Sequence, residues 1–250
     1  EAGKHVLLEK PMANYEVACK ELIQTAEAKK RVLMIAYCMR FHPLVMRMKE
    51  LLDQKTYGDV FQVSIWTEQL TRYPEDHWAS SKERLGGGQL FSHGCHYIDL
   101  LLWFLGRPIK GMHMGTNLGT PWMEREGTSN VTLEFENGRL GYHFGTWGAR
   151  GSRLRYAIHA HCTEGMIEAD ITNGRLVYIH RGEETVLLDA ESGKHTENEM
   201  AHFLDCIETG QQPLTDGIGS LQGLRVIWKL YEAENEGRIA DLTGLGLDEV

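Results

Sequence analysis

Two short apolar runs that flank an amphipathic stretch define the start of this 250-residue chain. Residues 5–11 have the length and composition of a buried strand that stops at a proline. Residues 31–37 form a second apolar run of strand length. Between them, apolar residues follow a helical period from about residue 15 to residue 30. Strand, helix and strand over this distance predict a βαβ unit, with parallel strands buried on both faces.

Downstream of this unit the sequence predicts further helices around one strand and a polar loop. Helical periodicity marks residues 42–53, 92–105, 197–208 and 220–236. A strand is expected over Val60–Glu68, and a polar loop at residues 71–85 leads into Gly86-Gly87-Gly88. Gly106 is a typical C-terminal stop for the helix that begins near Ser92.

From residue 110 to residue 188 the pattern changes to short alternating segments. Val131, Leu133 and Phe135 alternate with polar residues, and Asn137-Gly138 then gives a strong hairpin signal. Similar segments follow at residues 140–144, 156–161, 165–170 and 175–180. The pattern predicts a mainly antiparallel sheet with one apolar face that another domain or a second copy of the chain must cover.

Composition excludes several classes of protein. The formal net charge is -9 and no local run is basic, which argues against nucleic-acid partners. The five cysteines are scattered and form no CxxC pair, so we expect a reducing, cytoplasmic setting without disulfides. No apolar run is long enough to span a membrane, and the first residues do not resemble a signal peptide. A membrane partner is therefore not expected.

Glu9-Lys10-Pro11 directly follows the first predicted strand. In open α/β sheets, ligands bind at the carboxyl ends of the strands. A lysine at that edge is able to hydrogen-bond a substrate hydroxyl. The alternative is a surface lysine before a turn, because most lysines are exposed.

Gly86-Gly87-Gly88 lacks three consecutive Cβ atoms, which lets a backbone approach a ligand closely. It is not the phosphate-binding motif GxGxxG, because Phe91 stands at the place of the third glycine. A flexible turn is the alternative interpretation.

The segment 92–99 carries the second group of candidate residues. Ser92 and His96 are four residues apart and share one face of the predicted helix. His96 is able to exchange a proton near neutral pH, and Asp99 lies close enough to orient its imidazole or to bond a neighbouring strand. A packed structural histidine is the alternative.

Metal binding is not expected. His93, His96 and Asp99 are ligand types, as are His159, His161 and Cys162. However, neither group has a matching second pair, and the chain has no CxxC or HExxH pattern. Two histidines on one face of a strand are usually packing or solvent-facing residues.

In their order along the chain, these motifs resemble the glucose-fructose oxidoreductase and inositol dehydrogenase family (Gfo/Idh/MocA). The segments that carry the resemblance are Glu9-Lys10-Pro11, Arg40-Phe41-His42-Pro43, Gly86-Gly87-Gly88, His96-x-x-Asp99, residues 102–106 and residues 203–213. The resemblance covers nearly the whole chain. Each motif is weak alone, but their order is specific.

The resemblance implies a fold, an activity and a set of site residues. The fold would be an α/β remnant of a Rossmann domain at residues 1–40, followed at residues 41–250 by an α+β domain with a large, mainly antiparallel open sheet for substrate binding and oligomerisation. The activity would be hydride transfer between NAD or NADP and a secondary hydroxyl of a sugar, polyol or cyclitol, in a homo-oligomer that pairs through the sheet face. By position, the resemblance implies catalysis by Lys10 and His96, substrate binding by Arg40, Ser92, His93 and Asp99, and cofactor binding by Glu9, Lys10, Pro11, Gly87 and Gly88.

Two departures from the family pattern matter. The chain contains no glycine-rich phosphate loop, so we expect roughly 100 residues, a typical domain's worth, to be missing. On this interpretation the chain alone binds a dinucleotide poorly and is inactive, because the pyrophosphate needs that loop. Ser92 stands where many members have an aspartate, four residues before the histidine. Serine supplies no carboxylate, so either Lys10 and His96 share the proton work or the reaction has changed.

Two other functions stay open at this point. A family relative that uses its cofactor transiently would cleave glycosides by oxidation and elimination. A protein that kept the fold but lost turnover would only bind a sugar or a nucleotide. The sequence does not identify the sugar or distinguish NAD from NADP, since the residue that reads the 2′ position belongs to the absent segment.

Overall fold

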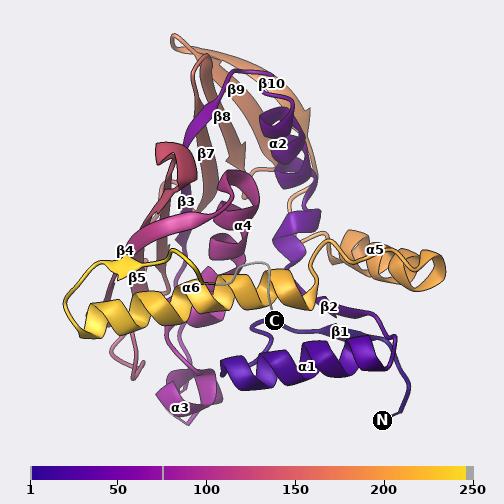
Figure 1. Cartoon of the computed structure of the whole chain (residues 1–250). Coiled ribbons are helices and arrows are strands. Elements are labelled where there is room, and N and C mark those ends of the chain that lie inside the picture. Colours follow the sequence, from indigo (N-terminus) through magenta and orange to yellow (C-terminus); the bar gives the residue numbers. More distant parts are fainter. Residues whose placement is uncertain (1, 75, 246–250) are drawn as a thin grey trace.

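In the computed structural model, which describes residues 2–74 and 76–245, the chain forms two sheets and the helices that pack on them (Figure 1). The strands are β1 (Val6–Leu8), β2 (Leu33–Ile35), β3 (Val60–Glu68), β4 (Pro108–Thr116), β5 (Thr128–Phe135), β6 (Leu140–Thr146), β7 (Tyr156–Cys162), β8 (Gly165–Asp170), β9 (Arg175–His180), β10 (Glu183–Asp189) and β11 (Ala240–Asp241). The helices are α1 (Glu16–Ala28), α2 (Pro43–Asp53), α3 (Lys82–Leu85), α4 (Cys95–Leu105), α5 (Thr196–Thr209) and α6 (Gly217–Asn235). Shorter helical turns are η1 (Cys38–Phe41), η2 (Trp78–Ser80), η3 (Leu90–Gly94) and η4 (Glu136–Gly138).

The N-terminal segment is the predicted βαβ unit. β1 and β2 pair in parallel, with Val6 opposite Leu33, and α1 connects them. Cys19 and Ile23 are the buried side chains of α1. The expectation that both strands are buried on both faces is wrong for β1, because Val6 is 43% exposed. Among the described strands only β2 pairs with β1, so this sheet has two strands and leaves β1 partly open to solvent.

The second sheet has nine strands in the order β10-β9-β8-β7-β3-β6-β5-β4-β11. Every neighbouring pair is antiparallel except β3 and β6, which confirms the mainly antiparallel sheet. The Asn137-Gly138 hairpin joins β5 to β6, and both residues have positive φ. β3 lies at the centre of this sheet, although the alternating pattern in the sequence begins only near residue 110.

Helices of the same chain cover the apolar face of the large sheet. Val131, Leu133 and Phe135 are fully buried in one core with residues of α2, α4 and α6. Each such side chain contributes about 1.5–3 kcal/mol by leaving water. The expectation that another domain or a second copy covers these residues is therefore wrong. Figure 1 shows α6, drawn in yellow, running beside α1 and across the sheet, and α6 contacts both β2 and β4.

The start of the central helix differs from the prediction. The sequence suggested one helix from Ser92, but Leu90–Gly94 forms a π-helical turn before α4 begins at Cys95. A π turn holds one more residue than an α turn, which changes which side chains share a face. The helix ends as expected at Gly106, where φ is 90°.

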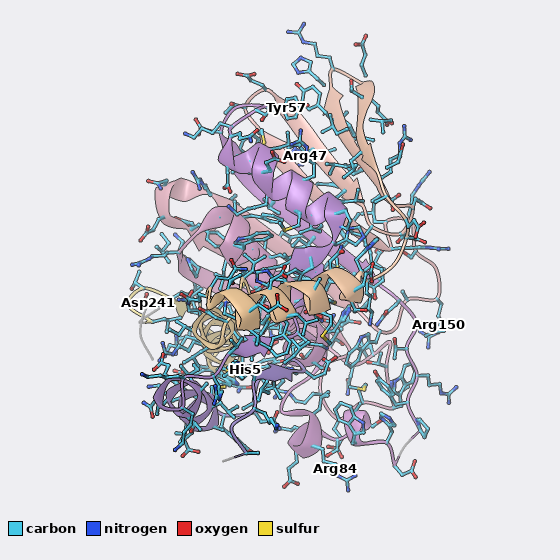
Figure 2. All side chains as sticks on the ribbon, turned by 90° about the vertical axis from the view of Figure 1, so that its right-hand side faces the viewer. His5, Arg47, Tyr57, Arg84, Arg150 and Asp241 are labelled. Carbon is cyan, nitrogen blue, oxygen red and sulfur yellow. The ribbon has the colours of Figure 1, made fainter. Side chains whose placement is uncertain are left out.

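The face of the large sheet opposite these helices carries rings and partly exposed apolar side chains. Trp66 packs against Tyr142 and His159, whose ring centroids lie 6.2 and 4.7 Å away. On the same side, Met114 is 58% exposed and Leu140 45%. With all side chains drawn, Arg47 and Tyr57 lie at one end of the molecule and Arg84 at the other (Figure 2). No helix among the described residues is long and apolar enough to cross a membrane.

Candidate active site

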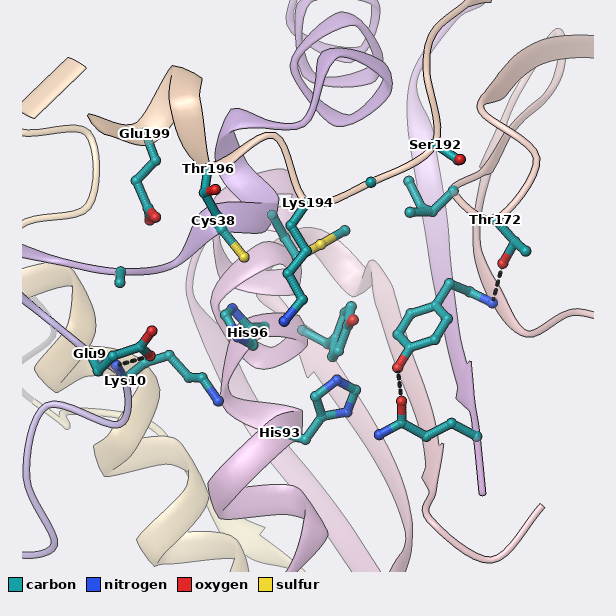
Figure 3. A pocket seen from close by; sticks show the side chains of 17 residues that line it. Glu9, Lys10, Cys38, His93, His96, Thr172, Ser192, Lys194, Thr196 and Glu199 are labelled. Atoms are coloured by element: carbon teal, nitrogen blue, oxygen red, sulfur yellow. Dashed lines mark hydrogen bonds between the residues drawn. The ribbon is translucent and has the colours of Figure 1, made fainter. Parts of the chain in front are cut away.

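A cavity of about 650 Å³ opens where the end of β1, the start of α4 and two connecting segments meet (Figure 3). One side is formed by Lys10 after β1 and by His93, His96 and Tyr97 of η3 and α4. Residues from connections and from the start of α5 form the other side. The remaining lining residues are Glu9, Ala36, Cys38, Met39, Gln69, Tyr156, Ile171, Thr172, Ser192, Gly193, Lys194, Thr196 and Glu199.

Lys10 reaches from the end of β1 to the π-helical turn. Its Nζ donates to the backbone carbonyl of Ser92 at 2.9 Å. The peptide bond between Lys10 and Pro11 is cis. This contact places the ammonium group beside His93 and His96, and it uses the backbone of Ser92 rather than its side chain.

The two histidines of this segment are held neutral. Burial is the main cause that lowers the pKa of His93 to about 3, and the Lys10 and Lys194 charges add to it. Burial, together with Lys10, His93 and Lys194, lowers the pKa of His96 well below its usual value. His96 is 7% exposed, and its buried Nδ1 has no hydrogen-bond partner among the described residues. A neutral imidazole is able to accept a proton at neutral pH.

The opposite side of the cavity holds residues that the sequence did not single out. The hydroxyl of Tyr156 donates to Oε1 of Gln69, and the Tyr156 ring meets His93 edge to face at 5.9 Å. Burial raises the pKa of Tyr156 to about 12, so its hydroxyl stays protonated. The hydroxyl oxygen of Thr172 accepts from the Tyr156 backbone N–H at 3.4 Å. These positions lie at strand ends and in connections, where no periodic pattern marks them.

Glu199 and Lys194 are the two charged residues that sequence analysis missed. Glu199 is 4% exposed, and burial together with the neighbouring Glu9 carboxylate raises its pKa to about 7. Its Oε1 has no hydrogen-bond partner among the described residues. Lys194 lies in the segment between β10 and α5, and Figure 3 shows its side chain reaching toward His96. A buried carboxyl without a hydrogen-bond partner in a cavity wall marks a candidate site residue. That burial is known only from the structure, so nothing in the sequence indicated it.

Arg40 and Asp99 were expected to contact substrate, but the structure pairs them with each other. Arg40 Nε and Nη2 donate to the two Asp99 carboxylate oxygens, each at 2.7 Å, and Nη1 donates to the Leu214 carbonyl. Burial raises the pKa of Asp99 and the Arg40 guanidinium opposes that shift. Neither residue lines the cavity. Asp99 therefore does not orient His96 but ties α4 to η1.

Gly87 and Gly88 were expected to contact cofactor, but both are packed inside the chain. A Cβ on Gly88 would lie 2.2 Å from the Glu126 carboxyl, and one on Gly87 would lie 2.5 Å from Phe91. The Gly88 N–H donates to the Tyr231 hydroxyl at 3.1 Å, and that hydroxyl donates to Glu126 at 2.5 Å. The glycines thus make room for a buried carboxyl that fixes the segment leading into η3.

Metal-ligating residues do not gather in the described part of the chain. No group of three or more His, Cys, Asp or Glu side chains there has the geometry to hold a metal ion. His159 pairs with Glu168 at 2.8 Å on the outer face of the sheet, whereas His93 and His96 lie on η3 and α4. The cavity instead offers ammonium donors, neutral imidazoles and carboxyls, which suit the binding and deprotonation of hydroxyl groups.

Two family models match the chain. Residues 1–37 match an oxidoreductase family with an NAD-binding Rossmann fold, and residues 45–168 match the GFO/IDH/MocA C-terminal domain. Residues 38–44 lie between the two matched regions.

Several individual oxidoreductases are similar to this chain in sequence or in fold. The chain is 24% identical over 244 residues to an NADP-dependent D-xylose 1-dehydrogenase of Haloarcula marismortui. That alignment covers 93% of this chain and 66% of the enzyme. It is 37% identical over 100 residues to a trans-1,2-dihydrobenzene-1,2-diol dehydrogenase of Xenopus tropicalis, covering 40% of this chain and 29% of that enzyme. Its fold is similar to that of an aldose-aldose oxidoreductase of Caulobacter crescentus, with a TM-score of 0.84 and 26% identity over 96% of this chain and 73% of the other. The chain thus spans about two thirds or less of the length of these two curated relatives.

Proposed function

The chain belongs to the Gfo/Idh/MocA family of oxidoreductases, and on that premise we propose that it forms the substrate side of an NAD(P)-dependent dehydrogenase. The reaction is hydride transfer between nicotinamide and a secondary hydroxyl carbon of a sugar, polyol or cyclitol. The observation that carries the proposal is the meeting of Lys10 and His96 in one cavity. Relatives named as D-xylose 1-dehydrogenase and D-glucoside 3-dehydrogenase support a sugar substrate.

The residues at the end of β1 fit the nicotinamide side of such a site. Glu9 and Glu199 place two carboxyl groups in one part of the wall, and Glu199 has an unpartnered buried oxygen. Carboxylates stabilise a positively charged ring nearby. When bound, NAD(P) supplies the hydride acceptor. Glu9, Lys10 and Pro11 would lie against it, while Gly87 and Gly88 contribute through the packing of the segment that precedes η3.

The proton of the substrate hydroxyl passes to His96 in this proposal. The imidazole is neutral at neutral pH, and its lowered pKa makes it a weak base. It accepts the alcohol proton as the hydride leaves the same carbon, because the oxygen-bound proton becomes strongly acidic at that point. Lys10 donates a hydrogen bond to the same oxygen and stabilises the negative charge that develops there. His93 flanks the substrate, and Ser92 contributes the backbone carbonyl that holds Lys10. Arg40 and Asp99 hold α4 in place without touching the substrate.

The proposal also covers the oligomeric state, the cellular compartment and the activity of these 250 residues alone. The outer sheet face, with Trp66, Met114 and Leu140, is a surface through which two copies pair. The five cysteines are unpaired and buried, which supports a reducing, cytoplasmic setting. Because these 250 residues contain no glycine-rich phosphate loop, we expect slow turnover from them alone.

The test is cofactor reduction by the holoenzyme. NAD or NADP is mixed with a panel of sugars, polyols and cyclitols, and the formation of the reduced cofactor is followed by absorbance. Deuterium at the reacting carbon should appear on the reduced nicotinamide. Substrate cleavage without net cofactor consumption would support oxidation and elimination instead. Binding of NADH and sugar without any turnover would support a binding protein.

A further inference from the structure

Two lysines from unrelated parts of the chain reach the same end of the cavity. Lys10 approaches from β1, where its Nζ donates to the Ser92 carbonyl at 2.9 Å. Lys194 approaches from the segment between β10 and α5, on the other side (Figure 3). Among the described residues, neither lysine forms an ion pair with a carboxylate.

The formal charges that act on His93 and His96 are those of the two lysines. Lys10 and Lys194 both lower the pKa values of His93 and His96, and no carboxylate opposes them there. Glu9 and Glu199 line the same cavity, where Glu9 helps to raise the pKa of Glu199, and all four charges act on the Cys38 thiol. The space around the histidines therefore holds two ammonium groups and two neutral imidazoles.

Two ammonium groups that form no ion pair attract an anion to the space beside the histidines. Lys194 is solvent-exposed at the mouth, so its ammonium group keeps most of its hydration until a ligand arrives. A ligand oxygen anion between Lys194 and Lys10 gains charge-assisted hydrogen bonds from both sides. A neutral hydroxyl gains only one ordinary hydrogen bond at the same place.

We propose that Lys194 binds a carboxylate of the substrate, so that the substrate class is a sugar acid or a similar polyhydroxy carboxylate. The inference rests on the proposed function, since it places the reacting hydroxyl at His96 and Lys10. The carboxylate lies toward Lys194, and the polyol chain extends along the cavity past His93 and Tyr156. Tyr156 and Gln69 supply neutral hydrogen-bonding groups along that path.

D-Gluconate and D-sorbitol test this inference, because they differ only in a carboxylate against a hydroxymethyl group. Ligand-observed NMR on the 250-residue chain measures both dissociation constants. We expect gluconate to bind about tenfold more tightly than sorbitol and to weaken as salt is raised. In Lys194→Gln that preference should fall to about twofold or less, because gluconate binding weakens far more than sorbitol binding. Lys30→Gln, which removes the same charge from an exposed lysine before β2, should keep the preference.

Several outcomes would overturn the inference. Equal binding of gluconate and sorbitol would do so, and so would an unchanged preference in Lys194→Gln. Displacement of gluconate by an equal concentration of inorganic phosphate would show a general anion site and not a sugar-acid site. The holoenzyme separates this inference from the proposed function. If neutral polyols reduce NAD(P) and gluconate is not preferred, the sugar-acid inference is wrong and the dehydrogenase assignment stands. If gluconate is preferred but no cofactor is reduced, the dehydrogenase assignment is wrong and the anion preference stands.

Discussion

The cavity has two walls that differ in how they are built. We call Lys10, His93, His96 and Tyr97 the inner wall, and Gln69, Thr172, Lys194 and Glu199, with their neighbours in the connecting segments, the outer wall. The inner wall belongs to a strand end and to η3 and α4, and His96 and Tyr97 are 7% and 3% exposed. The outer wall comes mostly from connections, where Ser192 and Lys194 are exposed.

This difference separates reaction from recognition. Proton transfer needs atoms held within tenths of an ångström, which packed elements provide. Choice among sugars depends on side chains that vary without disturbing the core, which connections provide. We therefore expect inner-wall changes to alter turnover or stability, and outer-wall changes to alter affinity for particular substrates.

The largest expected effect breaks the support of the inner wall. Asp99→Asn leaves the Arg40 charge buried without its carboxylate partner, since the two side chains are 3% and 12% exposed. We expect a loss of about 3–5 kcal/mol in the free energy of unfolding, measured by urea denaturation. Asp59→Asn, at the exposed Lys55–Asp59 pair, should leave it nearly unchanged. Similar losses for both variants would mean that the Arg40–Asp99 pair is not structurally special.

The next effect tests the chemistry of the inner wall directly. In the holoenzyme, His96→Ala should lower turnover by about 100-fold or more, the usual contribution of a general acid or base. Lys10→Ala should do similar damage, and the double variant should be little worse if both act on one proton. An outer-wall variant such as Thr172→Ala should change turnover far less than either. If His96→Ala lowers stability but the folded fraction keeps full turnover, His96 is a packing residue.

The sequence predicted the inner wall better than the outer one, for a physical reason. β3 (Val60–Glu68) has the predicted bounds, and the ends of α1 fall within about two residues of the prediction, because their apolar periods are set by burial. Lys10 and His96 were found from short motifs next to such elements. The partner of Asp99 was missed because Arg40 is 59 residues away, and no local pattern reports a contact at that separation.

The outer wall left almost no trace in the sequence. Lys194 lies in a polar segment whose sequence is typical of a solvent-exposed connection. Glu199 lies in the first turn of α5, where carboxylates are common because they interact favourably with the helix dipole. Only the fold shows that Glu199 is buried. The strand β10 was also missed, because its register shifts between Val186 and Leu188 and hides the alternation. The parallel pairing of β3 with β6 depends on contacts across the whole sheet.

A smaller effect concerns buried histidines behind the inner wall. His143 is fully buried, stacks on Tyr97 and lies 3.2 Å from the Thr67 hydroxyl, and burial lowers its pKa to about 3. Between about pH 3 and 6.5 only the unfolded state binds this proton, so stability falls as pH falls, by about 1.4 kcal/mol per pH unit.

The measurement is the slope of unfolding free energy against pH, from about pH 6 to about pH 4. His143→Gln should reduce that slope by about 1.4 kcal/mol per pH unit. Glu126, Glu199 and Asp99 have raised pKa values and oppose the trend, but they do so equally in both proteins. An unchanged slope in His143→Gln would mean that His143 is protonated in the folded protein.

The smallest expected effect, and the one that most sharpens the contrast between the walls, comes from Ser92→Asp. Ser92 lies in η3, and its backbone carbonyl already accepts from Lys10, so the substitution adds a carboxylate without removing that contact. A negative charge in the turn that precedes His96 favours the protonated imidazole and should raise its pKa, which NMR titration would measure. We expect turnover of neutral sugars to be preserved or to rise by a few fold, because the carboxylate restores the arrangement found in many family members. Binding of gluconate should weaken by a few fold, since the new charge opposes Lys10 and Lys194. If turnover of neutral sugars collapses instead, Ser92 marks a changed reaction, in which a carboxylate at this position does not belong.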